Sequence, residues 1–254
     1  MHQKNACFLV IGNEILSGRT QDANIQVLAC ALNEQGIRLT EVRIIPDIAE
    51  RIISTVGECR ARFDMVFTSG GIGPTHDDIT ALCVAEAVGV RLIRHEESFR
   101  RLETHFASKN FNEARQRMAW LPEGATTIEN SVSVAPGFSI GNVHVMAGVP
   151  KIFASMVKWL VPQLEGGTPL VSASWHSPTL YEGDLAQGLE AIQSDFPHLD
   201  IGSYPYQRKN GRGVALVAKG YDPAAVQSAA ERIHALISSL GANPIEGEPA
   251  PDQT

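Results

Sequence analysis

The first half of this 254-residue chain alternates short apolar runs with segments of helical spacing. Three apolar runs predict strands: Ala6–Ile11, Leu39–Ile45 and Asp64–Thr68. Three segments predict helices, the first and last of them followed by a glycine: 22–35, 48–62 and 77–88. Strands that are separated by helices pair in parallel through right-handed crossovers. The order therefore predicts an α/β domain with three layers, α/β/α, and a mostly parallel sheet.

Further along the chain the pattern changes at a linker. Segment 96–118 predicts a helix, Gly141-Asn142 predicts a hairpin turn between strands 138–140 and 143–146, and 148–160 predicts another helix. The composition of Pro162–Pro169 predicts a linker, so we expect domains at 1–165 and 170–242. The second domain is predicted as a small α+β unit, with strands at 170–175, 199–203 and 214–219 and helices at 181–194 and 222–240. Tyr204–Gly213 is predicted as a polar turn and 243–254 as a flexible tail.

Charge and cysteine content exclude several classes of protein. The chain has 21 Lys and Arg against 28 Asp and Glu, a net charge of −7, which disfavours a nucleic-acid-binding role. The apolar run at Ala6–Ile11 is too short for a signal peptide or a membrane span, so we expect a cytoplasmic protein with no membrane role. No C-x-x-C pair occurs, so the cysteines are predicted to be small buried hydrophobes: Cys7, Cys30, Cys59 and Cys83.

The segment that points to chemistry is Thr68–Thr80, TSGGIGPTHDDIT. A strand ends, glycines follow and a helix is predicted to begin. Glycines allow backbone N–H groups to approach a ligand closely, and a helix N-terminus favours an anion, so the segment predicts a phosphate cradle. Two interpretations stay open for Asp77 and Asp78: acids that cap the helix, or ligands of a divalent cation beside the phosphates. The spacing fits neither a Walker A loop nor G-x-G-x-x-G.

This segment, with IGNEILSGRTQDANIQVLACAL upstream, resembles the molybdopterin-binding (MoCF biosynthesis) domain family, in its competence/damage-inducible (CinA) branch. Five residues fall on the family's glycine-aspartate frame: Gly70, Gly71, Gly73, Asp78 and Thr80. The GPTHDD form is similar to that of the CinA branch and of the related domain of eukaryotic FAD synthases. Full-length CinA proteins continue into a nicotinamide-mononucleotide deamidase domain where this sequence ends, so that activity is not inferred.

The resemblance implies metal-dependent hydrolysis of a dinucleotide pyrophosphate such as ADP-ribose or FAD, with Mg, Mn, Co or Ni as the metal. Asp77 and Asp78 are then the catalytic candidates, with Asp78 on the metal. The candidate phosphate- or ligand-binding residues are Gly12, Glu14, Asp22, Asn24, Ser69, Gly70, Gly71, Gly73, Thr75, His76, Thr80, Asn130, Gly137 and Gly148. The alternative is a non-catalytic protein that binds a nucleotide or pterin-like molecule. The resemblance also implies a homo-oligomer.

Several residues keep two interpretations. Asp47 follows a predicted strand and is interpreted as a helix cap. Arg115 and Arg117 are either phosphate clamps or surface charges on a helix. His76 is either a general base or a group that binds metal or phosphate. The aromatic and basic residues of 204–209 are typical of nucleic-acid contacts, but the net charge favours an ordinary hairpin tip.

Overall fold

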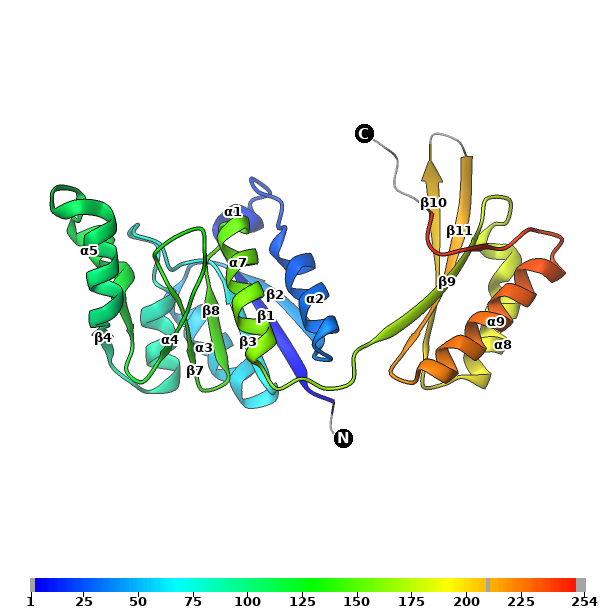
Figure 1. Cartoon of the computed structure of the whole chain (residues 1–254), viewed down its shortest axis with the longest axis horizontal. Coiled ribbons are helices and arrows are strands. Elements are labelled where there is room, and N and C mark those ends of the chain that lie inside the picture. Colours follow the sequence, from blue (N-terminus) through cyan, green and yellow to red (C-terminus); the bar gives the residue numbers. More distant parts are fainter. Residues whose placement is uncertain (1–2, 209–210, 250–254) are drawn as a thin grey trace. The chain divides into compact units, whose positions relative to one another are not determined.

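The computed structural model describes residues 3–208 and 211–249, which fall into two compact units, Met1–Thr168 and Pro169–Thr254 (Figure 1). The division lies inside the segment that the composition marks as a linker. Each unit has its own buried core.

The first unit is built on a six-stranded sheet with the order β2-β1-β3-β8-β7-β6. Its strands are β1 (Asn5–Ile11), β2 (Arg38–Ile45), β3 (Met65–Ser69), β6 (Thr126–Ile128), β7 (Gly137–Ile140) and β8 (Val143–Met146). The strands β2, β1, β3 and β8 pair in parallel, and β7 pairs antiparallel with both β8 and β6. The predicted α/β fold with a mostly parallel sheet is confirmed, as is the hairpin at Gly141-Asn142.

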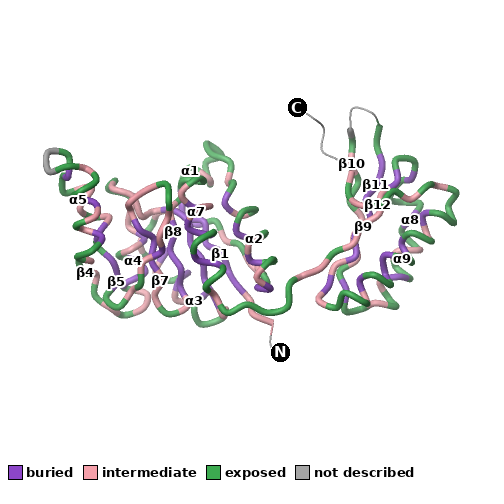
Figure 2. The backbone as a smooth tube through the Cα atoms, viewed as in Figure 1, coloured by how far each residue is buried: buried purple, intermediate pink, exposed green. Residues whose placement is uncertain are grey.

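Helices cover both faces of this sheet. The helices are α1 (Asn13–Leu16), α2 (Asn24–Glu34), α3 (Ala49–Arg62), α4 (Thr80–Val88) and α7 (Pro150–Leu160), the last followed by a 3₁₀ turn at Val161–Gln163. On one face, α2 and α7 bury a cluster that includes Phe8, Phe67 and Phe153, and on the other α3 and α4 bury Leu9 and Val84. Figure 2 shows the central strand β1 as buried, because helices cover it from both sides.

A satellite of the first unit follows α4. It contains β4 (Leu92–Arg94), α5 (Glu96–Asn110), α6 (Glu113–Gln116), a 3₁₀ turn at Arg117–Ala119 and β5 (Trp120–Pro122). The prediction of one helix over 96–118 is wrong. The helical backbone is interrupted at Ala107, which has φ +52°, and α5 ends before Phe111. The Asn112 side chain then accepts a hydrogen bond from the Arg115 N–H and starts a new helix.

The second unit is an antiparallel sheet, in the order β10-β11-β9-β12, with two helices packed on it. Its elements are β9 (Val171–Ser177), α8 (Glu182–Asp195), β10 (Asp200–Arg208), β11 (Gly211–Gly220), α9 (Pro223–Ser239) and β12 (Ile245–Glu246). The predicted polar turn over 204–213 is wrong. The ladder of β10 and β11 continues to Arg208 and Gly211, because backbone pairing does not require apolar side chains. Lys209 lies outside the described residues.

The predicted flexible tail is wrong where it begins. Ile245 and Glu246 form β12, which pairs with His176 and Trp175 of β9, and the His176 imidazole bonds to the Gly247 carbonyl at 2.8 Å. The free edge of β9 offers backbone groups that this segment can pair with, whatever its composition. Residues 250–254 lie outside the described residues.

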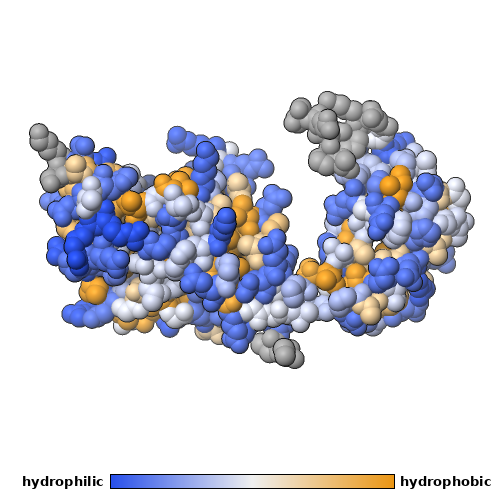
Figure 3. Space-filling view, in the orientation of Figure 1, coloured by the Kyte–Doolittle hydropathy of each residue, from blue (hydrophilic) through white to orange (hydrophobic). Residues whose placement is uncertain are grey.

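Three of the four cysteines are part of the buried core. Cys7, Cys59 and Cys83 are buried, whereas Cys30 is exposed on the outer side of α2, against the prediction that all four are buried. In the part of the chain that the structure describes, no helix is both long and apolar enough to span a membrane. Figure 3 shows a mainly hydrophilic face on each unit with scattered hydrophobic patches, as expected for protein surfaces exposed to water.

Candidate functional site

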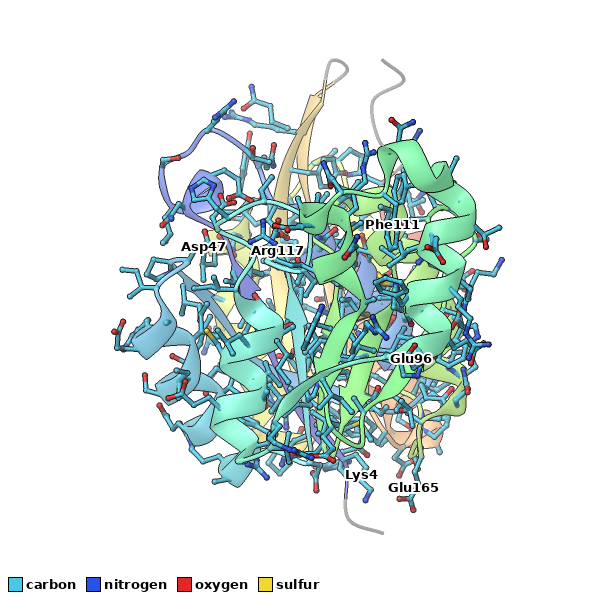
Figure 4. The ribbon with its side chains drawn as sticks, turned by 90° about the vertical axis from the view of Figure 1, so that its left-hand side faces the viewer. Lys4, Asp47, Glu96, Phe111, Arg117 and Glu165 are labelled. Atoms are coloured by element: carbon cyan, nitrogen blue, oxygen red, sulfur yellow. The ribbon has the colours of Figure 1, made fainter. Side chains whose placement is uncertain are left out.

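The candidate site lies where the parallel strands of the first unit end. From β1 the chain passes to β2 on one side, and from β2 it crosses to β3 on the other side of β1. In open α/β sheets, ligands bind outside the carboxyl ends of the strands at such a reversal. The segments that follow β1, β2, β3 and β8 all reach this edge, and Figure 4 shows Asp47 and Arg117 at this end of the unit, with Lys4 and Glu165 at the other end.

Two glycines hold the loop after β3 in a conformation that other residues adopt at a cost. Gly70 has φ +106° and Gly71 has φ +68°. A methyl group on Gly70 would overlap the Ile11 carbonyl oxygen, and one on Gly71 would overlap the Thr80 hydroxyl. The loop therefore passes directly over the end of β1 and against the start of α4. At Gly70 and Gly71 no side chain separates the backbone from the cavity.

The two adjacent carboxylates lie in the loop itself. Asp78 Oδ2 accepts hydrogen bonds from the Thr75 N–H at 2.8 Å and from the Thr75 hydroxyl at 2.6 Å. This closes a turn, so α4 begins at Thr80 and has no acid in its first turn. The prediction that the helix starts at Asp77 is wrong, because the Asp78 side chain caps a turn rather than the helix.

Asn24 connects the end of β3 to the loop after β8 through hydrogen bonds. Its side-chain amide, 3% exposed, donates 2.9 Å hydrogen bonds to the Ser69 hydroxyl and to the Gly148 carbonyl. Asn24 Oδ1 is buried and has no hydrogen-bond partner among the residues that the structure describes. Asn24 thus joins the end of β3 to the loop after β8. We expect its role to be indirect, because it positions these two segments and does not line the cavity.

These loops surround a cavity of about 390 Å³, a size typical of small-molecule sites. Four carboxylates line it: Glu14, Asp47, Asp77 and Asp78. The rest of the wall consists of the glycine loop, the polar residues Thr75 and Ser133, and apolar side chains, among them Ile11, Met118, Val149 and Ile152. No lysine or arginine is among the described residues that line this cavity.

The electrostatics of the cavity are most evident at Asp47. Burial raises the pKa of its carboxyl above the usual range, and the negative charges of Glu14 and Asp77 raise it further. A hydrogen bond of 2.8 Å from the Asn13 N–H to Asp47 Oδ2 opposes this effect in part. The carboxylates therefore repel one another, and a bound cation would relieve that repulsion.

The structure brings part of the predicted site to the cavity wall. The predicted residues that line it are Glu14, Gly70, Gly71, Gly73, Thr75, Asp77, Asp78 and Gly148. The predicted residues that do not line it are Gly12, Asp22, Asn24, Ser69, His76, Thr80, Asn130 and Gly137.

Most of this second group supports the loops. Asp22, two residues before α2, accepts a hydrogen bond from the Ile25 N–H in the first turn of that helix, and Gly12 donates its N–H to the Ile45 carbonyl. Asn130 Oδ1 accepts from the N–H groups of residues 132 and 133, which shapes the loop that carries Ser133 to the cavity. His76 instead points to solvent, with its side chain 94% exposed.

Sequence reasoning missed Asp47 as a site residue. The available signal was topological, since Asp47 follows the strand that neighbours β1, and the carboxyl ends of parallel strands meet at one edge. Its interpretation as a helix cap is also wrong, because its carboxylate accepts from Asn13 after β1 instead of from α3.

The donor set suits a hard divalent cation that is shared with a ligand. In the described residues, no group of three or more His, Cys, Asp or Glu is placed to hold a metal ion by itself. Mg²⁺ is typically held by one or two carboxylates together with waters and substrate phosphates. Carboxylate oxygens beside a bare glycine-loop backbone fit that pattern.

Comparisons with known proteins agree with this architecture. The family described as "Probable molybdopterin binding domain" matches residues 7–166, and "FAD synthase, middle domain" matches residues 176–244. Protein TK1472 of Thermococcus kodakarensis is 38% identical over 171 residues, which cover 61% of this chain and 68% of that protein. A CinA-like protein of Sulfurihydrogenibium is 40% identical over 135 residues, 52% of this chain and 34% of that protein.

Among solved structures, the first unit is similar to the protein described as "CinA with unknown function" from Thermoplasma acidophilum. That match has a TM-score of 0.60 and 30% identity, and it covers 63% of this chain and 97% of the other. The family match spans more than half of the chain, and the CinA-like relative and the CinA structure are similar to 52% and 63% of the chain. The chain therefore belongs to the family of probable molybdopterin binding domains, within its CinA-like branch.

Proposed function

We propose that the first unit hydrolyses a dinucleotide pyrophosphate of the ADP-ribose or FAD type, with a divalent cation such as Mg, Mn, Co or Ni. The observation that carries this proposal is the acidic cavity. Four carboxylates line it together with the glycine loop, and no cationic side chain of the described chain does so. A diphosphate, which is itself an anion, is attracted to such a wall only together with a cation.

Each part of the wall has a distinct task in the proposal. The loop over Gly70–Gly73 approaches the diphosphate with its backbone, since glycine leaves no side chain in the way. Asp78 holds the cation, and Asp77 lies beside it as the second catalytic candidate. When bound, the cation would neutralise phosphate charge and lower the pKa of a water. The apolar wall at Met118 and Ile152 packs against the rest of the ligand.

The family match supports a nucleotide or pterin-like ligand for this cavity, and the match of the second unit to a domain of FAD synthases points to nucleotide chemistry. We place the reaction in the cytoplasm, because all four cysteines are free thiols, as is usual in a reducing compartment. The proposal also includes a homo-oligomer, which sedimentation velocity would test.

The experiment is a chromatographic assay of ADP-ribose, FAD and NAD with each of the four metals. We expect hydrolysis with metal and none in EDTA, and a loss of at least a hundredfold in Asp78→Asn. The amide side chain of this variant would keep an oxygen that accepts from Thr75, so the substitution removes the charge and preserves the turn. Asp78→Ala removes both, and Glu50→Gln on the exposed side of α3 is the matched control.

Full activity in Asp78→Ala and Asp78→Asn would overturn the assignment. Metal-dependent binding without turnover of any tested substrate would instead favour the alternative, a protein that binds its nucleotide or pterin without hydrolysing it.

A further inference from the structure

The structure distinguishes Arg115 from Arg117, the two arginines that the sequence offers as phosphate clamps. Arg115 donates a hydrogen bond to the Asn110 carbonyl, and its guanidinium lies 4.5 Å from the centre of the Phe106 ring. These two contacts hold the Arg115 guanidinium against α5. Arg117 is exposed, and its guanidinium makes no hydrogen bond or ion pair with any residue in the described ranges 3–208 and 211–249. Its five N–H donors are available to a ligand.

Arg117 lines a second cavity that shares a wall with the first. The shared wall is Gly71, Ile72, Gly73, Thr75, Asp78 and Met118. Beyond that wall, the polar side chain of Arg117 and the indole of Trp120 line the second cavity together with the apolar residues Ala81, Leu121, Pro136 and Phe138. Glu14, Asp47 and Asp77 line only the first cavity, Arg117 and Trp120 line only the second, and the Asp78 carboxylate lies in the wall between them.

The small volume of the second cavity limits the size of the chemical group that it can hold. Its volume is about 40 Å³, which admits roughly three water-sized groups and does not enclose an aromatic ring. Trp120, however, is 41% exposed, so part of its indole is open to solvent beside the cavity. Its cross-strand neighbour Arg94 stacks on Phe99 at 4.5 Å and bonds to Glu96, so the Arg94 guanidinium is already engaged elsewhere.

We propose that Arg117 and Trp120 form a second subsite, which makes the site selective for dinucleotides over mononucleotides. This inference rests on the proposed function, because it places the diphosphate at the glycine loop. One half of the ligand lies in the larger cavity. Arg117 binds the phosphate or ribose of the other half, and its terminal ring stacks on the Trp120 indole, as bases stack on aromatic side chains elsewhere.

The test measures binding of two analogues that cannot be hydrolysed, both in Mg²⁺. One is methylene-bridged ADP, and the other is methylene-bridged diadenosine diphosphate, which adds a second adenosine. By titration calorimetry we expect the second adenosine to raise the affinity of the wild-type protein about tenfold. In Arg117→Gln and in Trp120→Leu, we expect that gain to fall below about twofold.

Matched controls separate a subsite from a general disturbance. Arg51→Gln removes an exposed arginine on α3, and Trp159→Leu removes a tryptophan of α7 that is 38% exposed. Both should keep the tenfold gain. If Arg117→Gln and Trp120→Leu keep the gain as well, or weaken both analogues equally, the second subsite is refuted. Neither analogue can turn over, so a failure of hydrolysis alone would refute the proposed activity without affecting this result.

Discussion

Acid should destabilise the first unit through a single buried histidine. His144 on β8 is 6% exposed, stacks on Phe67 with ring centres 5.0 Å apart, and has Nδ1 2.9 Å from the Ser139 hydroxyl. Burial lowers the pKa of His144 from 6.5 to about 4. The unfolded chain therefore binds a proton that the folded chain excludes, and stability falls as the pH drops from 6.5 toward 4.

The size of the effect follows from this difference. One pKa unit corresponds to about 1.4 kcal/mol, so full protonation of the unfolded state costs about 3 kcal/mol below pH 4. Between pH 7 and pH 5, the titration of His144 lowers the free energy of unfolding by about 2 kcal/mol. This is a large fraction of the roughly 5–15 kcal/mol that is typical of a domain.

The assay is urea unfolding at pH 7 and pH 5, followed by tryptophan fluorescence in a Trp175→Phe background. The two remaining tryptophans, Trp120 and Trp159, both report on the first unit. The comparison is with His144→Phe, which keeps an aromatic ring against Phe67 and cannot titrate. On going from pH 7 to pH 5, we expect the free energy of unfolding to fall by about 2 kcal/mol more in the wild-type protein than in His144→Phe. An equal loss in both proteins would refute the reasoning, because contributions from surface carboxylates cancel in the difference.

Three further changes have defined outcomes. Gly71→Ala should destabilise the chain by about 1–2 kcal/mol through its positive φ alone, and abolish ADP binding through displacement of the loop, as thermal shift and calorimetry would show. Asn24→Leu should cost about 1–3 kcal/mol in urea unfolding and weaken ADP binding, since the loops after β3 and β8 lose their tie. Asp47→Asn should raise the melting temperature in metal-free buffer at pH 7 and weaken Mg²⁺ binding, because it relieves the repulsion in the cavity; a lower melting temperature would contradict this.

The architecture of the first unit can be predicted from the sequence, because its strands and turns are marked by short segments of the chain. The apolar run at Ala6–Ile11 predicts a strand that is indeed buried on both faces, and the Gly141-Asn142 pair marks its hairpin correctly. Errors occur where side chains compete with helix formation. Asn112 restarts a helix within 96–118, and Asp78 closes a turn before α4.

The candidate site is less accessible to sequence reasoning, because it depends on which strands are neighbours. The glycine loop could be found from its composition, but Asp47 joins the cavity only because β2 lies beside β1. Similarly, Arg115 and Arg117 are two residues apart and look alike in sequence. Only the contacts of Arg115 with Asn110 and Phe106 distinguish them.

The most direct test of the account is the dependence of diphosphate binding on a cation. Calorimetric titration of the full chain with ADP would be made in Mg²⁺ and again in EDTA, for the wild-type protein and for Asp78→Asn. The acidic wall predicts binding in Mg²⁺ that becomes at least tenfold weaker in EDTA, and a variant that gains little from Mg²⁺. Equal affinity in Mg²⁺ and EDTA, with no effect of Asp78→Asn, would contradict the claim that these carboxylates recruit a cation to hold a diphosphate.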